Sequence, residues 1–344
     1  MTEIRIYIIN VSILKLTWLI LFFTLLHIPN LSFAQLITYP KENPVELGKV
    51  KWLRNYDDAV RASMDKKIPV FILFQEVPGC GNCTKFGNGI LSHPLIVEAI
   101  ETYFVPLCIY NNQKGHDKKV LEKFNEPSWN NPVIRVINQD GKDLVIRQTD
   151  FRSVATTVIT LQKAISASGK EVPEYLKLLL EETEAREKSN KEEVYFSMYC
   201  FWTGEKEISG LPGIIGTEAG YMLGKEVVKV TYNSDKTSLS DIFTKSKKMG
   251  CADEVYGSIS NDNNIVTKPA GAYKKDSEDK YYLSKSIYKV IPMTDLQKTK
   301  VNRALGTDQD PKCFLSFRQL SLINDPKINK SQIAQNIEKV WWKM

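Results

Sequence analysis

The chain has 344 residues, of which 43% are hydrophobic and 25% charged, with a formal net charge of +6. This composition is typical of globular protein, and the length indicates two domains behind the N-terminal segment, since one domain averages roughly 150 residues. Acidic and basic residues are interspersed, which argues against a nucleic acid partner. The chain has only 3 histidines, which argues against a histidine-rich metal site.

The N-terminal segment has the features of a signal peptide. Arg5 and Lys15 are followed by the apolar run Leu16–Ile28. Ser32-Phe33-Ala34 then provides small residues at the positions that a signal peptidase recognises at its cleavage site. An uncleaved membrane anchor is the alternative, but the run is short for a span of about 20 residues. We therefore predict a signal peptide over residues 1–34 and an exported protein, either periplasmic or secreted.

The cysteines favour redox chemistry over a structural role. An exported thiol must be paired, buried or chemically used. Only two of the six are close in sequence, which fits neither a disulfide-stapled small domain nor a zinc site built from two close pairs. We predict no metal and no cofactor. The cysteines are Cys80, Cys83, Cys108, Cys200, Cys251 and Cys313.

The elements of the first domain alternate between apolar strands and helices. A continuous apolar run predicts a strand buried on both faces. A break at Val77-Pro78-Gly79 and the pair Cys80-Gly81-Asn82-Cys83 follow this strand. The predicted elements are a strand over 70–74, a helix over 84–91, a helix over 94–103, a strand over 104–110, a strand over 133–137 opened by Pro132, and a turn over 138–141.

This order resembles the thioredoxin superfamily over roughly Val50 to Gly169, and we predict an α/β thioredoxin fold for residues 47–169. The resemblance implies that Pro132 is cis and lies beside the cysteine pair. Two positions depart from the family pattern. Gly79 replaces the usual Trp before the first cysteine, and Phe74 stands where a buried acid often assists proton transfer.

The cysteine pair has a physical basis for reactivity. Cys80 would lie at a helix N-terminus, where free backbone N–H groups and the helix dipole favour a thiolate. Cys83, one turn later and more enclosed, would resolve the mixed disulfide. The alternative is a static disulfide or an incidental thiol pair. Cys108, inside an apolar strand, is predicted to be buried and inert.

Residues 170–191 are predicted to be a charged helical linker, because a helix-like run after Pro173 becomes strongly charged up to Lys191. The following residues, 192–344, predict an α+β two-layer sandwich of βαββαβ type. Its expected elements are strands at 194–199, 214–221, 226–232 and 282–291, helices at 200–208, 239–248 and 294–305, and a C-terminal helix from Lys330.

This second domain resembles the A-type peptide methionine sulfoxide reductases over roughly Glu192 to Leu305. Three of the four residues of the family signature Gly-Cys-Phe-Trp are present, with Tyr199 in place of Gly. The matching segments are Cys200-Phe201-Trp202, Glu205, Leu211-Pro212-Gly213, Thr217 to Tyr221, Glu226 to Val230, and Tyr232. The loop before Glu226 departs from the pattern, since only Met222 to Lys225 remains.

The resemblance implies a mechanism of sulfoxide reduction. Cys200 would attack the sulfoxide sulfur, and Phe201 with Trp202 would hold the substrate methyl group. Glu226 would protonate or hydrogen-bond the sulfoxide oxygen. Two assignments stay open. Either Tyr256 or Tyr282 would supply a phenol, and either Cys251 or Cys313 would condense with the sulfenic acid left on the attacking cysteine.

The leading hypothesis is an exported redox enzyme in which the second domain reduces methionine S-sulfoxide in oxidised proteins. The thioredoxin-like domain would supply its electrons at the high effective concentration of a tethered partner, and a membrane thiol-reducing system would in turn reduce Cys80 and Cys83. The alternative is a thiol–disulfide oxidoreductase that acts on disulfide-containing exported proteins, with a non-catalytic C-terminal binding module. A third option is a binding protein whose cysteine sites are both inert.

Overall fold

A computed structural model describes residues 37–257, 265–278, 280–328 and 334–343. The predicted signal peptide over residues 1–34 lies outside these ranges and stays a prediction. Within them, no helix combines the length and the apolar character needed to cross a bilayer.

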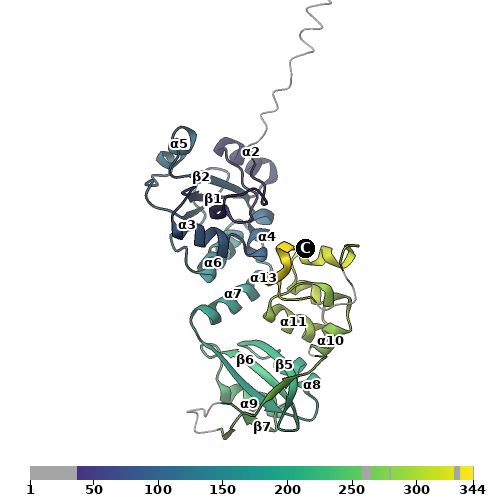
Figure 1. The fold of residues 1–344 in the computed structure, drawn as a ribbon. Helices are drawn as coiled ribbons and strands as arrows, with labels where there is room; N and C mark the ends of the chain where they lie inside the picture. Colours follow the sequence, from purple (N-terminus) through teal and green to yellow (C-terminus); the bar gives the residue numbers. More distant parts are fainter. Residues whose placement is uncertain (1–36, 258–264, 279, 329–333, 344) are drawn as a thin grey trace, which may run out of the picture. The chain divides into compact units, whose positions relative to one another are not determined.

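Residues from Ile37 onward form one compact unit (Figure 1). We refer to residues 37–167 as the first module, to residues 191–306 as the second module and to residues 311–343 as the C-terminal segment.

The first module is built on a three-stranded sheet in the order β2-β1-β3. β1 pairs in parallel with β2 and antiparallel with β3. Isolated bridges from Leu53 to Leu107 and from Gln148 to Ile134 extend its two edges. The elements are η1 (Val45–Leu47), α2 (Tyr56–Lys66), β1 (Val70–Gln75), α3 (Gly81–Lys85), the π-helical turn η2 (Phe86–Ile90), α4 (Pro94–Tyr103), β2 (Val105–Tyr110), α5 (His116–Lys123), β3 (Val133–Ile137) and α6 (Val154–Ala167).

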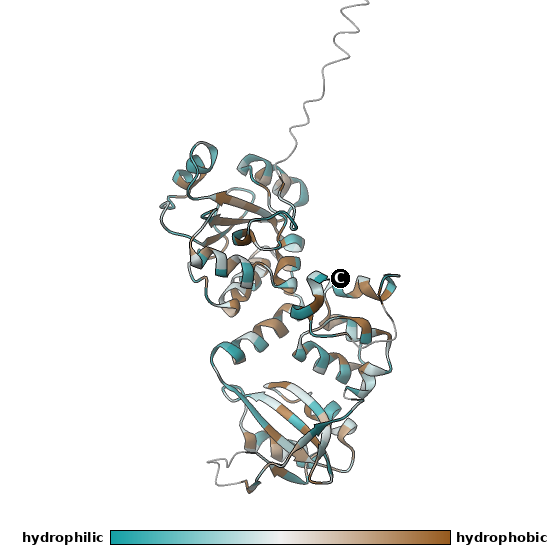
Figure 2. Cartoon of the chain, viewed as in Figure 1, coloured by the Kyte–Doolittle hydropathy of each residue, from teal (hydrophilic) through white to brown (hydrophobic). Residues whose placement is uncertain are grey.

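β1 is buried on both faces, as its continuous apolar sequence predicts. Phe71 and Leu73 pack into one apolar cluster with residues of α4 and α6. Ile72 and Phe74 pack into a second cluster with residues of α2 and α5. Figure 1 shows these helix pairs on opposite sides of the sheet, and Figure 2 shows its strands as mainly hydrophobic. The sheet therefore places the end of β1, where Cys80 follows, on a rigid support.

The segment predicted as a charged helical linker is helical over α7 (Glu174–Glu187), but one face of it is packed rather than solvated. Tyr175, Leu176 and Leu179 belong to the same apolar cluster as Phe71. Ile337 of α13 (Ile337–Val340), which is fully buried, belongs to it as well. The core of the first module is thus completed by residues far along the chain.

Polar contacts also tie the C-terminal segment to α4. Glu98 is almost fully buried and accepts hydrogen bonds from the Ser316 hydroxyl at 2.5 Å and the Arg318 backbone N–H at 2.8 Å. Arg318 also pairs with Glu101. Burial raises the pKa of the Glu98 carboxyl. The remaining elements of this segment are η4 (Pro311–Phe314), α12 (Phe317–Ser321), η5 (Leu322–Asn324) and η6 (Trp341–Lys343).

The second module contains a six-stranded sheet in the order β8-β7-β4-β6-β5-β9. Its elements β4-α8-β5-β6-α9 follow the predicted order, but the next strand in the chain is β7, which the sequence did not predict. The elements are β4 (Lys191–Ser197), α8 (Phe201–Ile208), β5 (Ile214–Met222), β6 (Lys225–Asn233), α9 (Leu239–Lys248), β7 (Glu254–Tyr256), β8 (Thr267–Lys268), β9 (Tyr273–Lys275), α10 (Tyr281–Ser284), η3 (Ile287–Val290) and α11 (Asp295–Gly306).

The strand predicted over 282–291 is wrong, since α10 and η3 occupy this stretch. Lys280 adopts a left-handed conformation with φ of 59°, and its backbone N–H donates to the fully buried Glu205 at 3.0 Å. Its ammonium pairs with the same carboxylate at 2.7 Å. These contacts turn the chain into a helix. The predicted start of a C-terminal helix at Lys330 lies outside the described residues, and α13 begins after an Asn336 cap.

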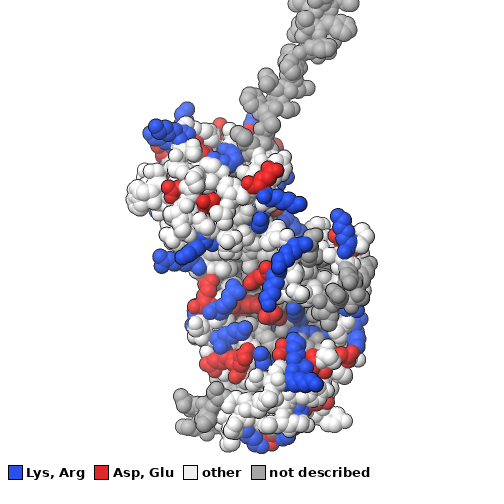
Figure 3. Space-filling view, in the orientation of Figure 1, with Lys and Arg blue, Asp and Glu red and all other residues white. Residues whose placement is uncertain are grey.

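Basic and acidic side chains are intermingled on the face of the molecule drawn in Figure 3. This distribution follows from the interspersed charges of the sequence.

Replacing Ile337 by Ala should lower the free energy of unfolding by about 2–4 kcal/mol, because it leaves a cavity in the core of the first module. Urea denaturation would measure the effect. Ile287→Ala is the matched control, since that side chain is 64% exposed and should change stability by less than about 0.5 kcal/mol. Equal effects of the two changes would show that α13 is not docked on the first module.

Candidate functional site: two cysteines at helix N-termini

Cys80 is the N-cap residue of α3, directly after the turn that follows β1. Its backbone is extended, with φ of −72° and ψ of 175°, and its carbonyl accepts a hydrogen bond from Thr84 N–H at 3.1 Å. The Cys80 side chain is exposed, whereas the Cys83 side chain is buried. A substrate can therefore reach the first thiol but not the second.

Gly79 is required by the close packing of this turn. A Cβ atom at this position would lie 2.3 Å from the Glu76 carbonyl oxygen and 2.6 Å from Cys83 Cβ. Its backbone N–H donates to the Glu46 carboxylate at 2.8 Å. The departure from the family's Trp is therefore part of the local structure, and any larger residue would force the turn to rearrange.

The two thiols of the pair have opposite pKa shifts. A hydrogen bond from the Cys83 backbone N–H lowers the pKa of the Cys80 thiol; burial acts in the opposite direction, and the Asn82 N–H adds to the lowering. Burial raises the pKa of Cys83 to about 11. The two sulfurs are 3.8 Å apart. Near neutral pH the pair thus combines an accessible thiol that favours ionisation with an enclosed thiol that stays protonated.

The loop before β3 reaches the buried thiol. The Asn131–Pro132 peptide bond is cis, as the resemblance implies. The Cys83 thiol donates to Asn131 Oδ1 at 2.8 Å, so the resolving sulfur is held by the residue that precedes this proline. Sequence reasoning singled out Pro132 and missed Asn131, although its position beside the proline was a usable signal.

Glu76 and Glu46 are two further site residues that sequence reasoning missed. Phe74 is fully buried and cannot move protons, as expected. Glu76 instead has a carboxylate oxygen within 4.8 Å of both sulfurs of the pair. Among the described residues, Glu76, Cys80 and Cys83 are also the one group of three whose donor atoms are close enough to share a metal ion. Glu46 comes from η1, far from the pair in sequence.

Cys200 occupies an equivalent position in the second module, as the N-cap residue of α8. The Glu226 carboxylate accepts a hydrogen bond from Phe201 N–H at 2.9 Å, in the first turn of that helix. The Thr203 hydroxyl donates to the Cys200 sulfur at 3.4 Å. The structure therefore brings Cys200 and Glu226 together, although they are far apart in sequence.

Aromatic rings surround the start of α8. Phe201 is buried, with its ring centroid 5.4 Å from that of Trp202 and 5.2 Å from that of Tyr221. Trp202 stacks on Tyr281 at 4.2 Å, and its indole N–H donates to Asp276 at 3.1 Å. Sequence reasoning did not assign Tyr221, Tyr281 or Asp276 to the site.

The two tyrosines predicted to supply a phenol lie differently. Tyr256 is buried in β7, opposite Tyr195, and its hydroxyl donates to Glu254. None of its contacts within the described ranges is with Cys200. Tyr282 lies beside Tyr281, with their ring centroids 5.5 Å apart. Of the described phenols, Tyr221, which packs on Phe201, is better placed.

The remaining cysteines separate into one candidate partner for Cys200 and two others. Cys251 is almost fully buried; burial is the main cause that raises its pKa, and the negative charges of Glu207 and, less strongly, Cys200 raise it further. Cys313 donates to the Asp310 carbonyl, and its charged neighbours are Asp310 and Glu174. Cys108 is fully buried, which raises its pKa to about 12 and fits the predicted inert thiol.

Comparisons with solved structures find likenesses over about a third of the chain. A solution structure of a thioredoxin from Thermus thermophilus is 18% identical, with a TM-score of 0.31, and the match covers 35% of this chain and 90% of that one. A structure described as DsbH oxidoreductase is 18% identical, with a TM-score of 0.30, over 36% and 90% of the two chains. No protein-family model and no curated protein matches the chain.

The first module has a thioredoxin-like fold. This assignment rests on its parallel and antiparallel strand pairs, its cysteine pair at the start of a helix after the central strand, and its cis Pro132.

In the reduced chain at pH 7, iodoacetamide should modify Cys80 first, at least about tenfold faster than Cys313, because the thiolate is the reactive form. Cys313 is a matched control, since it is also exposed but has a raised pKa. Cys83 and Cys108, with pKa values of about 11 and 12, should stay unmodified. Mass spectrometry of timed digests would measure this order, and equal rates at Cys80 and Cys313 would contradict it.

Proposed function

We propose that the chain is a thiol–disulfide oxidoreductase that acts through Cys80 and Cys83. The observation that carries the proposal is the asymmetry of the pair. One thiol is exposed with a lowered pKa, and the other is buried, protonated and 3.8 Å away. An attacking and a resolving thiol need these opposite properties.

The reaction has two exchange steps. The Cys80 thiolate attacks one sulfur of a substrate disulfide, the substrate S–S bond breaks, and the leaving thiolate takes up a proton. Cys83 then loses its proton, for which the Glu76 carboxylate is the nearby acceptor, and attacks the Cys80 sulfur. The second substrate thiol leaves. The substrate has gained two electrons and two protons, and the Cys80–Cys83 disulfide has formed. A membrane thiol-reducing system would restore the dithiol in an exported protein.

Reduction of methionine S-sulfoxide at Cys200 is the second candidate function. Its support is the contact of Glu226 with the first turn of α8, among the rings of Phe201, Trp202 and Tyr221. In this reaction the thiolate attacks the sulfoxide sulfur, the oxygen passes to Cys200 as a sulfenic acid, and methionine is released. Condensation with the Cys251 thiol would expel water and form a disulfide, which the first module would reduce.

The turn between β5 and β6 bears on this second candidate. Leu223 and Gly224 both have positive φ values, 52° and 75°, and form a two-residue hairpin loop. The longer loop that carries a tyrosine in the resembling family has no equivalent here. Tyr221, just before the turn, is the phenol that would replace it.

With dithiothreitol present, the full chain should accelerate reduction of insulin disulfides. Cys80→Ser should reduce the rate to that of dithiothreitol alone, because the attacking sulfur is gone. Cys83→Ser, reduced and then freed of dithiothreitol before insulin is added, should accumulate a mixed disulfide with insulin on a non-reducing gel, since the resolving thiol is absent. Cys313→Ser is the control and should behave as wild type. Unchanged insulin reduction by Cys80→Ser would remove the proposal.

For the second candidate, a peptide with methionine S-sulfoxide should be reduced by wild type and not by Cys200→Ser. Glu226→Gln should lower the rate roughly 10²- to 10⁴-fold if this acid protonates the oxygen. Without added reductant, one turnover of the Cys80→Ser variant, whose first module cannot reduce the product, should leave a Cys200–Cys251 disulfide that mass spectrometry can map. Turnover that does not depend on Cys200 would end this candidate and leave the first proposal standing.

A further inference from the structure

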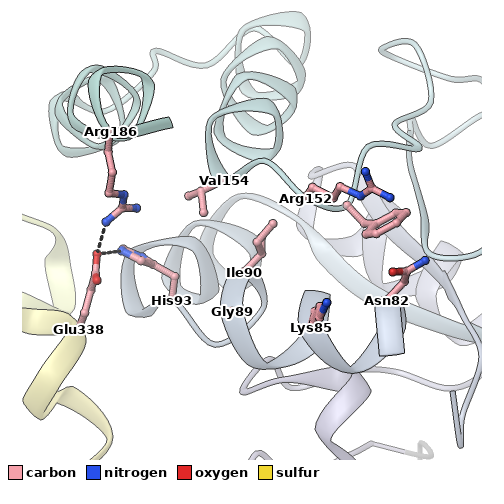
Figure 4. Close-up of a pocket in the computed structure, with 10 residues that line it drawn as sticks. Asn82, Lys85, Gly89, Ile90, His93, Arg152, Val154, Arg186 and Glu338 are labelled. Atoms are coloured by element: carbon pink, nitrogen blue, oxygen red, sulfur yellow. Dashed lines mark ion pairs between the residues drawn. The ribbon is translucent and has the colours of Figure 1, made fainter. Parts of the chain in front are cut away.

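A groove of about 420 Å³ runs beside the cysteine pair in the first module. This volume falls within the range of roughly 300–1,000 Å³ usual for ligand sites. Figure 4 shows its lining residues, which come from α3, η2, the start of α4, the loop before α6, the end of α7 and α13. Asn82, which lies between the two cysteines, is one of them. The groove therefore reaches the first turn of α3, whose N-cap residue is Cys80.

The groove carries excess positive charge. Lys85 and Arg152 are both exposed, and within the described ranges neither has an acidic partner. Glu338 is the single acid in the lining. It is already engaged by His93 at 3.3 Å and by Arg186 at 3.5 Å, contacts that lower its pKa to about 2. Lys85 and Arg152 are therefore available to bind an anionic ligand.

The lining also has apolar and unsatisfied polar parts. Ile90 is buried, and Val154 and Phe151 are half-buried beside it. The Arg152 guanidinium lies 5.4 Å from the centre of the Phe151 ring. His93 is 6% exposed, and its Nδ1 has no hydrogen-bond partner within the described residues. An inorganic anion would leave the apolar surface unused, whereas a peptide with acidic and apolar side chains would cover both.

We propose that this groove binds an acidic, partly apolar stretch of the polypeptide whose disulfide Cys80 attacks. The inference rests on the proposed thiol–disulfide exchange and adds its substrate preference. Acidic side chains would face Lys85 and Arg152, and an apolar side chain would rest on Ile90 and Val154. The groove then holds a substrate segment while its disulfide lies at the exposed sulfur.

Three peptides would test this proposal. They share a disulfide loop and differ in one flanking stretch, Asp-Leu-Glu, Asn-Leu-Gln or Lys-Leu-Lys. At low salt, wild type should reduce the acidic peptide with a KM roughly fivefold to tenfold below that of the amide peptide, with similar kcat. The double variant Lys85→Glu with Arg152→Glu should lose this preference and favour the basic peptide. Both side chains are exposed, so the variant should fold.

The matched control carries the same charge change elsewhere. Lys119→Glu with Lys163→Glu alters two exposed lysines of α5 and α6 that do not line the groove, and it should keep the preference of wild type. A preference that persists in the groove variant, or disappears equally in the control, would overturn the assignment. The assignment would also be overturned if a small dicarboxylate disulfide showed a KM as low, relative to the amide peptide, as that of the acidic peptide.

Binding without turnover separates this proposal from the proposed function. A fluorescent acidic peptide with serine in place of both cysteines should bind the reduced full chain, and its anisotropy should show weaker binding to the groove variant. Such binding together with absent disulfide reduction would defeat the oxidoreductase proposal and leave an acidic-peptide site. Reduction of all three peptides with equal KM, together with no anisotropy change, would defeat the acidic-peptide site and leave the oxidoreductase proposal standing.

Discussion

The hydrogen bonds from the first turn of α3 to the Cys80 sulfur are the interaction on which the first site depends. Backbone N–H groups at Cys83 and Asn82 stabilise negative charge on an exposed atom. They can do so only because the turn after β1 brings the sulfur over the helix end. Gly79, which leaves no space for a Cβ, makes that approach possible. The buried sheet beneath fixes where the turn begins, so reactivity at the surface depends on packing below it.

The two sulfurs of the pair lie in different environments. Asn131 accepts from the Cys83 thiol, and the Glu46 carboxylate fixes the Gly79 backbone. Glu76 places a carboxylate near both sulfurs, whereas Phe74 is apolar and fully buried. The Cys80 side chain is therefore exposed to solvent, whereas the Cys83 side chain is buried. The second module repeats the placement of a cysteine at a helix start, with Glu226 as the acid at the first turn.

Local patterns were sufficient to predict part of this arrangement. The apolar run of β1, the cysteine pair and Pro132 each carry their signal within a few residues, and the order of β4, α8, β5, β6 and α9 followed from periodicity. Contacts between distant residues were not predictable in this way. Glu46 reaches Gly79 from 33 positions away, and Tyr281 stacks on Trp202 across the module. The strand expected over 282–291 failed because Lys280 bonds a buried carboxylate that composition does not reveal.

The packing of Ile337 beside β1 and α7 separates the order of synthesis from the order of folding. A ribosome releases the thioredoxin-like half first, but Ile337, which fills its core, emerges about 170 residues after the end of α6. Until then, apolar surface on α4, α6 and α7 stays uncovered, and such surface promotes aggregation. A shortened chain that ends after α6 would retain the reactive cysteines but would lack the side chain that closes the core beneath them.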